Sequence, residues 1–389
     1  MPLLMIPGPI EVSPAVQEAS AAPPPGHLEK SFIEAFGRAL SAMRSVWLAS
    51  DDSQPFVVPG GGTLSMEMAA TNLLDPGQRA VVASSGYFSD RMAEMLRRRG
   101  VEVTVVAAEP GDAPTLTAVD EALSRTKSHA LYVTHVDTST GVRVDAQSLA
   151  SLARKHGVLS VFDGVCATAG ERFEMGAWGA DVYLTASQKA IGLPPGLALL
   201  VASKRALEAR AALRVAPPMT MDFEQWAPIM RAYESRGPSY FSTPATTLVR
   251  ALPVGLDEIL AKGIDARFEL HRRSAVAMRA AWASMGLALL PRSEAITANT
   301  LSAIMYPEGV GPELVGAIGS RGVTVAGGLH PALKTKYFRV GHMGDVLRRP
   351  DALRATVRAV AESLDSLGRR TDADAAVAAF DVALGAAVA

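Results

Sequence analysis

The sequence has a single cysteine, Cys166, in 389 residues. One cysteine excludes an internal disulfide framework and any zinc site built from several cysteines, and it is typical of a reducing compartment. Seven histidines are present, but none has the HExxH spacing of a metal-binding helix. We therefore expect no metal site and predict a cytoplasmic protein.

Strong charge of one sign and long apolar runs are also missing. The formal net charge is -1, and no block of lysine or arginine resembles the surface of a nucleic-acid binder. No apolar stretch reaches the roughly 18 residues that a membrane-spanning helix needs. The start, "MPLLMIPGPI", lacks the basic region of a signal peptide. We expect neither nucleic acid nor a membrane as partner, which favours small molecules.

What is present is the composition of a large folded protein. Hydrophobic residues make up 49% of the chain and charged residues 20%, as in well-packed globules. The length exceeds that of one compact domain. We predict an N-terminal arm and large domain over residues 1–249, a small C-terminal domain over 250–366, and a linker with a C-terminal helix over 367–389.

Seven short apolar runs alternate with helix-length segments between about residues 55 and 205. They lack strict alternation, which is typical of strands buried on both faces of a parallel sheet. Long helical stretches follow at about 221–235 and 243–285, and then the strand candidates "LALLP", "TLSAIMY", "VTVAGG" and "YFRVGH". We predict an α/β fold in which helices sandwich a mostly parallel seven-stranded sheet, with a smaller C-terminal α/β domain. The seven runs are "PFVV", "RAVVAS", "VEVTVV", "HALYVTH", "LSVFDG", "DVYLTAS" and "LALLVAS".

Ligands of such sheets bind beyond the carboxyl ends of the strands. There "PFVVPGGGTL" places Gly60 to Gly62 between a strand and a helix predicted to open at Thr63. Free backbone N–H groups at a helix start form an anion site, with the Thr63 hydroxyl as a further donor. No GKS or GKT follows, so this is not a P-loop. A phosphate would fit, and an ordinary tight turn is the alternative.

Two chemically active side chains follow buried strands. "LSVFDG" ends at Asp163, and "DVYLTASQK" leads to Lys189. Taken singly, Asp163 could cap a turn and Lys189 could be a solvated surface lysine. A partly desolvated lysine, however, becomes a nucleophilic amine. Pyridoxal 5'-phosphate needs an anion site, a partner for its ring nitrogen and an amine that captures its aldehyde. The phosphate cradle, the acid and the lysine together match these three needs.

The stretches "GGGT", "HVDTSTG", "SQKAIGLPPGL" and "FRVGHMG" resemble those of the class V aminotransferases among the fold type I pyridoxal phosphate enzymes, nearest the alanine:glyoxylate and serine:pyruvate group. The resemblance runs from "PGPIEVSP" to "FRVGHMGD". It implies that Lys189 holds the cofactor as a Schiff base and is the general base, and that Asp163 keeps the ring nitrogen protonated. It also implies cofactor contacts from Gly61, Gly62, Thr63, Phe88, Thr138 and Gln188, with His135 in support.

The resemblance further implies that each active site is shared. Tyr240 and Thr243 in "SYFSTPATT" would reach the phosphate of a neighbouring subunit, which predicts a homodimer. Arg339 in "YFRVGH" would bind the substrate carboxylate, with a structural ion pair as the alternative. Gly61 stands where relatives often have Ser, and Phe88 where they often have Trp, so cofactor affinity could be lower.

These residues predict a pyridoxal phosphate-dependent aminotransferase. It would move the amino group of alanine or serine to glyoxylate or pyruvate by a ping-pong mechanism. A single carboxylate-binding arginine favours such short donors over aspartate or glutamate, and the loop at Pro7 to Ile10 is expected to shape the pocket. A lyase or eliminase on the same scaffold stays open, as does a non-catalytic cofactor-binding protein. A desulfurase needs a mobile cysteine over the substrate. It is disfavoured because the only cysteine, Cys166, lies in a turn three residues after Asp163.

Overall fold

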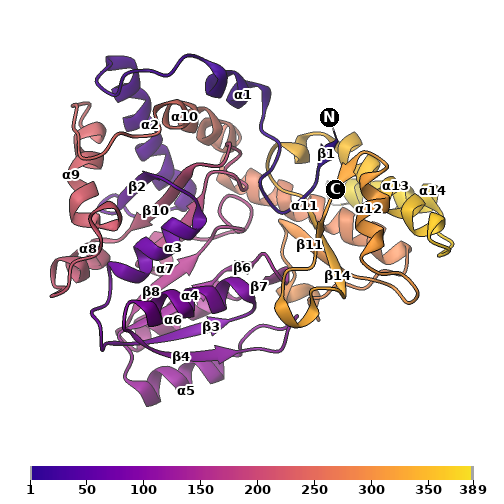
Figure 1. Cartoon of the computed structure of the whole chain (residues 1–389), viewed down its shortest axis with the longest axis horizontal. Coiled ribbons are helices and arrows are strands. Elements are labelled where there is room, and N and C mark those ends of the chain that lie inside the picture. The colour runs from indigo at the N-terminus through magenta and orange to yellow at the C-terminus, as the bar shows by residue number, and fades with distance from the viewer. Residues whose placement is uncertain (1, 387–389) are drawn as a thin grey trace.

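The computed structural model describes residues 2–386, which form two α/β parts (Figure 1). An N-terminal arm connects them. Its strand β1 (Leu3–Leu4) pairs in parallel with β12 (Val323–Thr324) of the second part, whereas α1 (Pro14–Ala21) and α2 (Lys30–Trp47) lie on the first part. The arm therefore passes from one part to the other.

The first part is built on a seven-stranded sheet in the order β2, β10, β9, β8, β5, β3, β4. All neighbours are parallel except β10, which is antiparallel to both β2 and β9. The predicted mostly parallel sheet is confirmed, and each of the seven predicted runs is one of its strands. Their bounds are β2 Gln54–Pro59, β3 Arg79–Ser84, β4 Glu102–Ala107, β5 Ala130–Thr134, β8 Leu159–Asp163, β9 Val182–Ala186 and β10 Leu197–Ala202.

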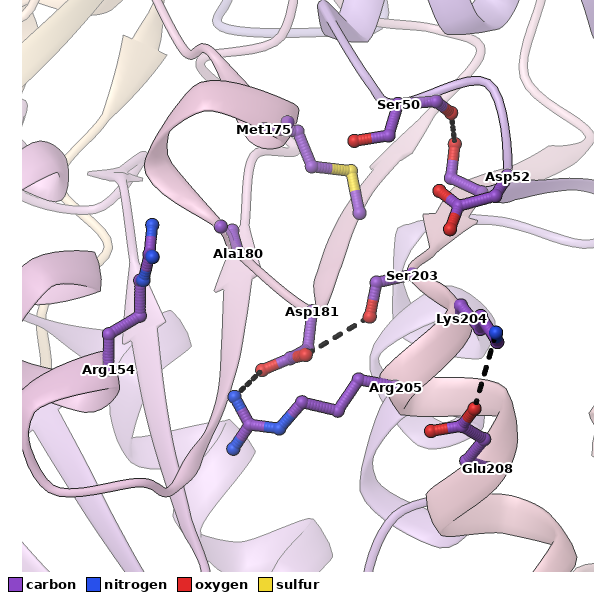
Figure 2. Close-up of a pocket in the computed structure, with 13 residues that line it drawn as sticks. Ser50, Asp52, Arg154, Met175, Ala180, Asp181, Ser203, Lys204, Arg205 and Glu208 are labelled. Carbon is purple, nitrogen blue, oxygen red and sulfur yellow. Dashed lines mark hydrogen bonds and ion pairs between the residues drawn. The ribbon is translucent and has the colours of Figure 1, made fainter.

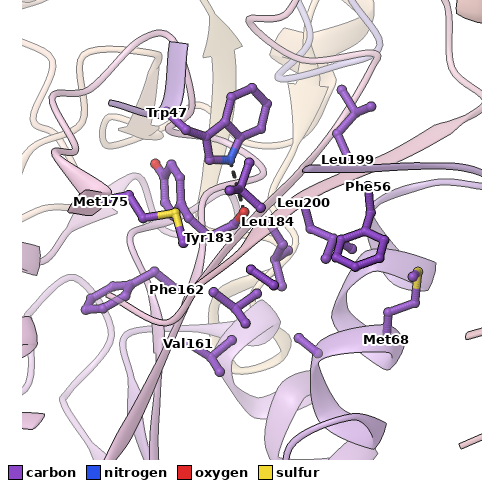
Figure 3. Packing of buried hydrophobic residues seen from close by; sticks show 14 of the residues in the cluster. Trp47, Phe56, Met68, Val161, Phe162, Met175, Tyr183, Leu184, Leu199 and Leu200 are labelled. Carbon is purple, nitrogen blue, oxygen red and sulfur yellow. Dashed lines mark hydrogen bonds between the residues drawn. The ribbon is translucent and has the colours of Figure 1, made fainter. Parts of the chain in front are cut away.

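Helices cover both faces of this sheet, so its central strands are buried throughout. Every residue of β5, β8, β9 and β10 is buried. On one side Trp47 of α2 packs over Tyr183 and Leu184 (Figure 3), and its indole N–H donates to the Tyr183 carbonyl over 3.0 Å. The apolar ring is thus buried with its polar atom satisfied.

The helix-length segments between the first strands form helices. They are α3 (Gly62–Thr71), α4 (Tyr87–Arg98), α5 (Leu116–Thr126) and α6 (Ala146–Lys155). The helix predicted to open at Thr63 begins one residue earlier. Three further helices complete the first part, namely α7 (Met175–Trp178), α8 (Lys204–Ala211) and α9 (Phe223–Glu234).

The helical stretch predicted over 243–285 is two helices, α10 (Thr246–Leu260) and α11 (Ile264–Ser284). Gly263 separates them with a φ of 81°, a conformation outside the right-handed helical region that glycine adopts readily. Helix α10 runs across the predicted boundary between residues 249 and 250. The division into 1–249, 250–366 and 367–389 therefore stays a prediction.

The second part contains a small antiparallel sheet of β11 (Leu301–Met305), β14 (Tyr337–Gly341) and β13 (Ala326–Gly327). The run "VTVAGG" is split, because β12 pairs with the N-terminal arm and β13 with β14. The prediction of a strand at "LALLP" is wrong, since this run forms only an isolated bridge between Leu289 and Ile304. Pro291 at its end lacks the N–H that a ladder needs.

Three more helices, α12 (Glu313–Gly319), α13 (Pro350–Ser366) and α14 (Ala373–Ala386), pack on the second part. Phe380 of α14 is fully buried in a hydrophobic cluster with Trp282 and Val357, so the C-terminal helix helps to close this core. Within residues 2–386, no helix is both long and apolar enough to cross a membrane.

Candidate active site

A cavity of about 170 Å³ lies at the carboxyl ends of the parallel strands. Loops after five strands and one residue of the N-terminal arm form its walls, as expected where parallel strand ends converge. It brings together seven of the predicted site residues and Gly8, which belongs to the loop expected to shape the pocket; the other three lining residues have no predicted role. The lining residues are Gly8, Gly62, Thr63, Met66, Phe88, Val136, Thr138, Asp163, Val165, Gln188 and Lys189.

Lys189 lies in the turn between β9 and β10 and is 8% exposed. Its Nζ donates a hydrogen bond to the carbonyl of Pro7 in the N-terminal arm. Burial lowers the pKa of its ammonium below the usual value, and the positive charge of Arg339 acts in the same direction. The other lysines of the described chain are exposed. Lys189 is therefore the lysine most readily converted to a neutral, nucleophilic amine.

Asp163 ends β8 and is 3% exposed. Its Oδ1 accepts a 2.8 Å hydrogen bond from the Val165 N–H, but no residue between 2 and 386 forms an ion pair with it. Burial raises the pKa of this carboxyl to about 7, the Val165 N–H opposes the shift, and the charge of Asp137 adds to it. A buried acid without a cationic partner is suited to pair with the protonated ring nitrogen of pyridoxal phosphate.

The anion cradle is formed by the start of α3. An added Cβ at Gly62 would lie 3.0 Å from the Val165 side chain, so glycine permits the close approach of α3 to the loop after β8. Gln188 supplies a second fitting feature, because its buried Oε1 has no hydrogen-bond partner among the described residues. Rotation of the amide would present its NH₂ group instead. Both features suit a bound phosphorylated molecule.

Asp137 fixes the opposite wall, a role that the sequence did not suggest. This fully buried carboxylate accepts from the N–H groups of Phe88 (3.0 Å) and Ser89 (3.2 Å) at the start of α4 and from the Ser139 N–H (2.9 Å). It thus satisfies N–H groups that a helix start leaves free. The result is a fixed position for Phe88, which lines the cavity.

His135 lies behind the cavity and does not line it. Its Nδ1 is 3.0 Å from the Tyr183 hydroxyl, and burial lowers its pKa to about 3, which keeps the ring neutral. This placement agrees with a supporting position.

Arg339 lies in β14 and is 9% exposed. Its Nε donates to the carbonyl of Gly327 over 2.9 Å and its Nη1 to that of Thr138 over 3.1 Å. The structural ion pair considered as an alternative is absent from the described residues. A guanidinium buried without an acid is costly, and a carboxylate ligand would offset that cost.

Four predicted residues lie outside the cavity lining, namely Gly61, Arg339, Tyr240 and Thr243. Tyr240 is 62% exposed, and its hydroxyl is 3.4 Å from that of Thr243. The cavity also has apolar walls, Met66, Val136 and Val165, without predicted roles. Their residue types are the same as those of core positions, so the sequence carries no signal that separates them.

A larger and more open cavity of about 440 Å³ lies at the amino ends of the parallel strands, and Figure 2 shows the residues that line it. Its charges are largely paired with one another. Arg205 contacts Asp181 over 3.4 Å, Lys204 contacts Glu208 over 4.0 Å, and Ser203 donates to Asp181 over 3.0 Å. By contrast, Asp163 and Lys189, which line the cavity at the carboxyl ends of the strands, form no ion pair among the described residues.

A mostly parallel α/β sheet with a buried lysine and a buried, unpaired aspartate at its carboxyl edge defines a fold type I pyridoxal phosphate enzyme. The family model "Aminotransferase class-V" matches residues 19–355, and the chain belongs to this family. It is a pyridoxal phosphate-dependent aminotransferase.

Similar proteins agree with this assignment. The chain is 37% identical to alanine–glyoxylate aminotransferase 1 of Saccharomyces cerevisiae over 88% of this chain and 91% of the relative. It is 33% identical to L-aspartate–glyoxylate aminotransferase of Paracoccus denitrificans over 88% and 86%. The solved structure of pyridoxamine-pyruvate aminotransferase from Mesorhizobium loti shares its fold, with a TM-score of 0.92, 24% identity, and coverage of 99% of this chain and 97% of that one.

Proposed function

We propose that this enzyme transfers the amino group of a small amino acid, alanine or serine, to a small 2-oxo acid, glyoxylate or pyruvate, in a ping-pong reaction. The observation that carries the proposal is the common cavity of Lys189 and Asp163. The relatives named for glyoxylate favour that acceptor. One of them is named for aspartate, so the preference for a short donor is part of the proposal.

Each unpaired group has a separate task in this proposal. Lys189 Nζ would hold the cofactor covalently, Asp163 would hold the proton on the ring nitrogen, and Gly61, Gly62, Thr63 and Gln188 would bind the phosphate. Phe88 and Thr138, which line the cavity, would contact the ring and its phenolic oxygen. Arg339 binds the α-carboxylate of the substrate.

The cofactor, when bound, supplies an electron sink that stabilises negative charge at the α-carbon of the amino acid. The protein controls where the proton goes. Once the amine of the donor has replaced it on the cofactor, the freed Lys189 Nζ would move a proton from the α-carbon of the donor to the cofactor, and in the second half-reaction it would move one from the cofactor to the α-carbon of the acceptor. Arg339, fixed by the carbonyls of Gly327 and Thr138, sets the direction from which the α-carbon faces this amine.

We also propose a homodimer with shared sites. Tyr240 and Thr243 place a hydroxyl pair in an exposed loop before α10, and neither residue lines the cavity of their own subunit. A partner subunit would receive these hydroxyls at its phosphate.

A panel of amino donors against glyoxylate and pyruvate tests the function. We expect keto acid formation from alanine or serine that requires an acceptor and is lost in Lys189→Ala. The matched control is Lys30→Ala, which changes an exposed lysine. Release of pyruvate and ammonia from serine without an acceptor would contradict transamination and support a lyase.

A further inference from the structure

Arg91 of α4 is placed beside the anion cradle. Its Nη1 lies 3.5 Å from the Thr63 hydroxyl at the start of α3, and its Nη2 donates to the Tyr87 hydroxyl over 2.8 Å. The guanidinium carbon lies 5.3 Å from the centre of the Phe88 ring. Tyr87 and Phe88 precede Arg91 by one helical turn, so all three share one face of α4. Arg91 therefore links the cradle with the aromatic wall.

The positive charge of Arg91 has no acidic partner among residues 2–386. Its neighbours are two hydroxyls and two aromatic rings, and the side chain is half-buried. Its charge reaches the cavity, because it helps to lower the pKa of Asp163 against the larger effect of burial. By contrast, Arg98 on the same helix pairs with Glu94 over 2.9 Å. Arg91 is thus a cation held close to the site with its charge uncompensated.

The cradle itself lacks one side-chain donor. Gly61 offers only backbone, and no atom lies within 4 Å of a Cβ added there. A phosphate bound at the start of α3 carries close to two negative charges, whereas the other donors proposed for it, which are backbone N–H groups, hydroxyls and an amide, carry no full positive charge. A guanidinium, with several donors in one plane, is suited to this role.

We propose that Arg91 is a phosphate-binding residue of this active site, which supplies a charged donor beside a cradle where Gly61 offers only its backbone. The inference rests on the proposed function, since it needs the cofactor phosphate at the start of α3. It assigns the aromatic pair Tyr87 and Phe88 a second task, to hold the guanidinium in place over the cradle.

Binding of pyridoxal phosphate and of phosphate-free pyridoxal to cofactor-depleted protein tests the proposal. For Arg91→Gln we expect about a 10- to 100-fold weaker affinity for pyridoxal phosphate, the effect of losing a charge-assisted hydrogen bond. Affinity for pyridoxal should not change. Arg97→Gln on the exposed side of α4 is the control and should leave both affinities unchanged.

Two further variants keep the test decisive if Arg91→Gln fails to fold. Arg91→Lys retains the charge and the side-chain stem, and we expect a smaller loss confined to pyridoxal phosphate. Gly61→Ser should strengthen pyridoxal phosphate binding, most clearly in the Arg91→Gln protein.

The contradicting results are distinct. Equal losses for both ligands, or no loss for either, would overturn the role of Arg91 and leave the proposed function intact. A wild-type protein that binds neither ligand would overturn the proposed function together with this inference.

Discussion

At the scale of single residues, Asp163 and Arg339 differ from the buried charges that are paired with one another. Arg210 and Asp222, for example, are also buried but form two hydrogen bonds of 2.6 Å to each other. Asp163 and Arg339 have no such partner in the described chain and contact only backbone groups. Charges buried in this way destabilise a protein unless a ligand compensates them. A ligand that pairs with Asp163 and Arg339 would offset the free energy lost by burying them. This explanation makes two predictions.

The first concerns the stability of the cofactor-free protein. The Asp163 carboxyl has a pKa of about 7 in the fold against an ordinary value of 3.8, so between about pH 4 and pH 7 the native state binds more protons than the unfolded chain. Ionising Asp163 in the fold therefore costs stability as pH rises through this window, up to about 4 kcal/mol above it. We expect Asp163→Asn to be more stable than wild type at pH 8 and equal to it near pH 4.

Urea unfolding of both cofactor-free proteins across this pH range measures the difference. Other titrating groups are common to the two proteins and cancel. A difference that is constant with pH, or that grows toward pH 4, would show that Asp163 is not a carboxyl held in its protonated form by burial.

The second prediction concerns substrate binding. Replacement of Arg339 by Gln keeps a polar side chain but removes the charge, and truncating one side of a buried charge pair costs roughly 2–5 kcal/mol. We expect KM for the amino donor to rise about 100-fold, with a smaller change in kcat. Steady-state kinetics check this, with Arg97→Gln as the matched control. An unchanged KM would show that the carboxylate of the substrate binds to a residue other than Arg339.

At the scale of elements, the N-terminal arm contacts the side chain of Lys189 directly. Gly8 has a φ of 90°, and a Cβ added there would lie 2.5 Å from Cδ and 2.9 Å from Nζ of Lys189. The arm thus fixes the lysine by direct contact, and glycine is required for that contact.

Gly8→Ala tests this contact. The added methyl group should displace Lys189 and lower kcat at least 10-fold, in line with the rate lost when a reacting group is misplaced. Gly309→Ala is the control, because its φ is 80° and nothing lies within 4 Å of its added Cβ. Both variants carry the strain of a positive φ, and only Gly8→Ala adds the contact with Lys189. Equal kinetic effects in the two would refute a specific role for the arm.

Some elements of this fold were predictable from the sequence and others were not. The seven strands were predictable because buried parallel strands are continuous apolar runs, and Asp163 and Lys189 stood out because polar residues at such strand ends are unusual. Helices α1 and α2 were not predicted, because they lie before the strand–helix alternation begins. The pairing of Leu3 with Val323 depends on chain segments that no local pattern connects. Asp137 and Arg91 were missed because an acid near a turn and an arginine on a helix are usually cap and surface residues.

At the scale of the whole molecule, the proposed dimer makes a prediction about mixed subunits. If Tyr240 and Thr243 serve the partner's site, a Lys189→Ala subunit carries intact donors for its neighbour. A subunit with Tyr240→Phe and Thr243→Ala carries an intact lysine. Mixing two inactive proteins should then restore activity, to about a quarter of wild type for random pairing in equal amounts. Co-purification through an affinity tag on one variant confirms pairing, and no recovery in mixed dimers would contradict shared sites.

The central claim is that the ε-amine of Lys189 binds pyridoxal phosphate covalently. Borohydride reduction of the holoenzyme followed by peptide mass spectrometry tests it most directly, because reduction fixes the cofactor on the amine that holds it. We predict a phosphopyridoxyl group on the peptide that contains Lys189 and on no other lysine peptide. An active enzyme with the group on a different lysine, or with none, would contradict the account.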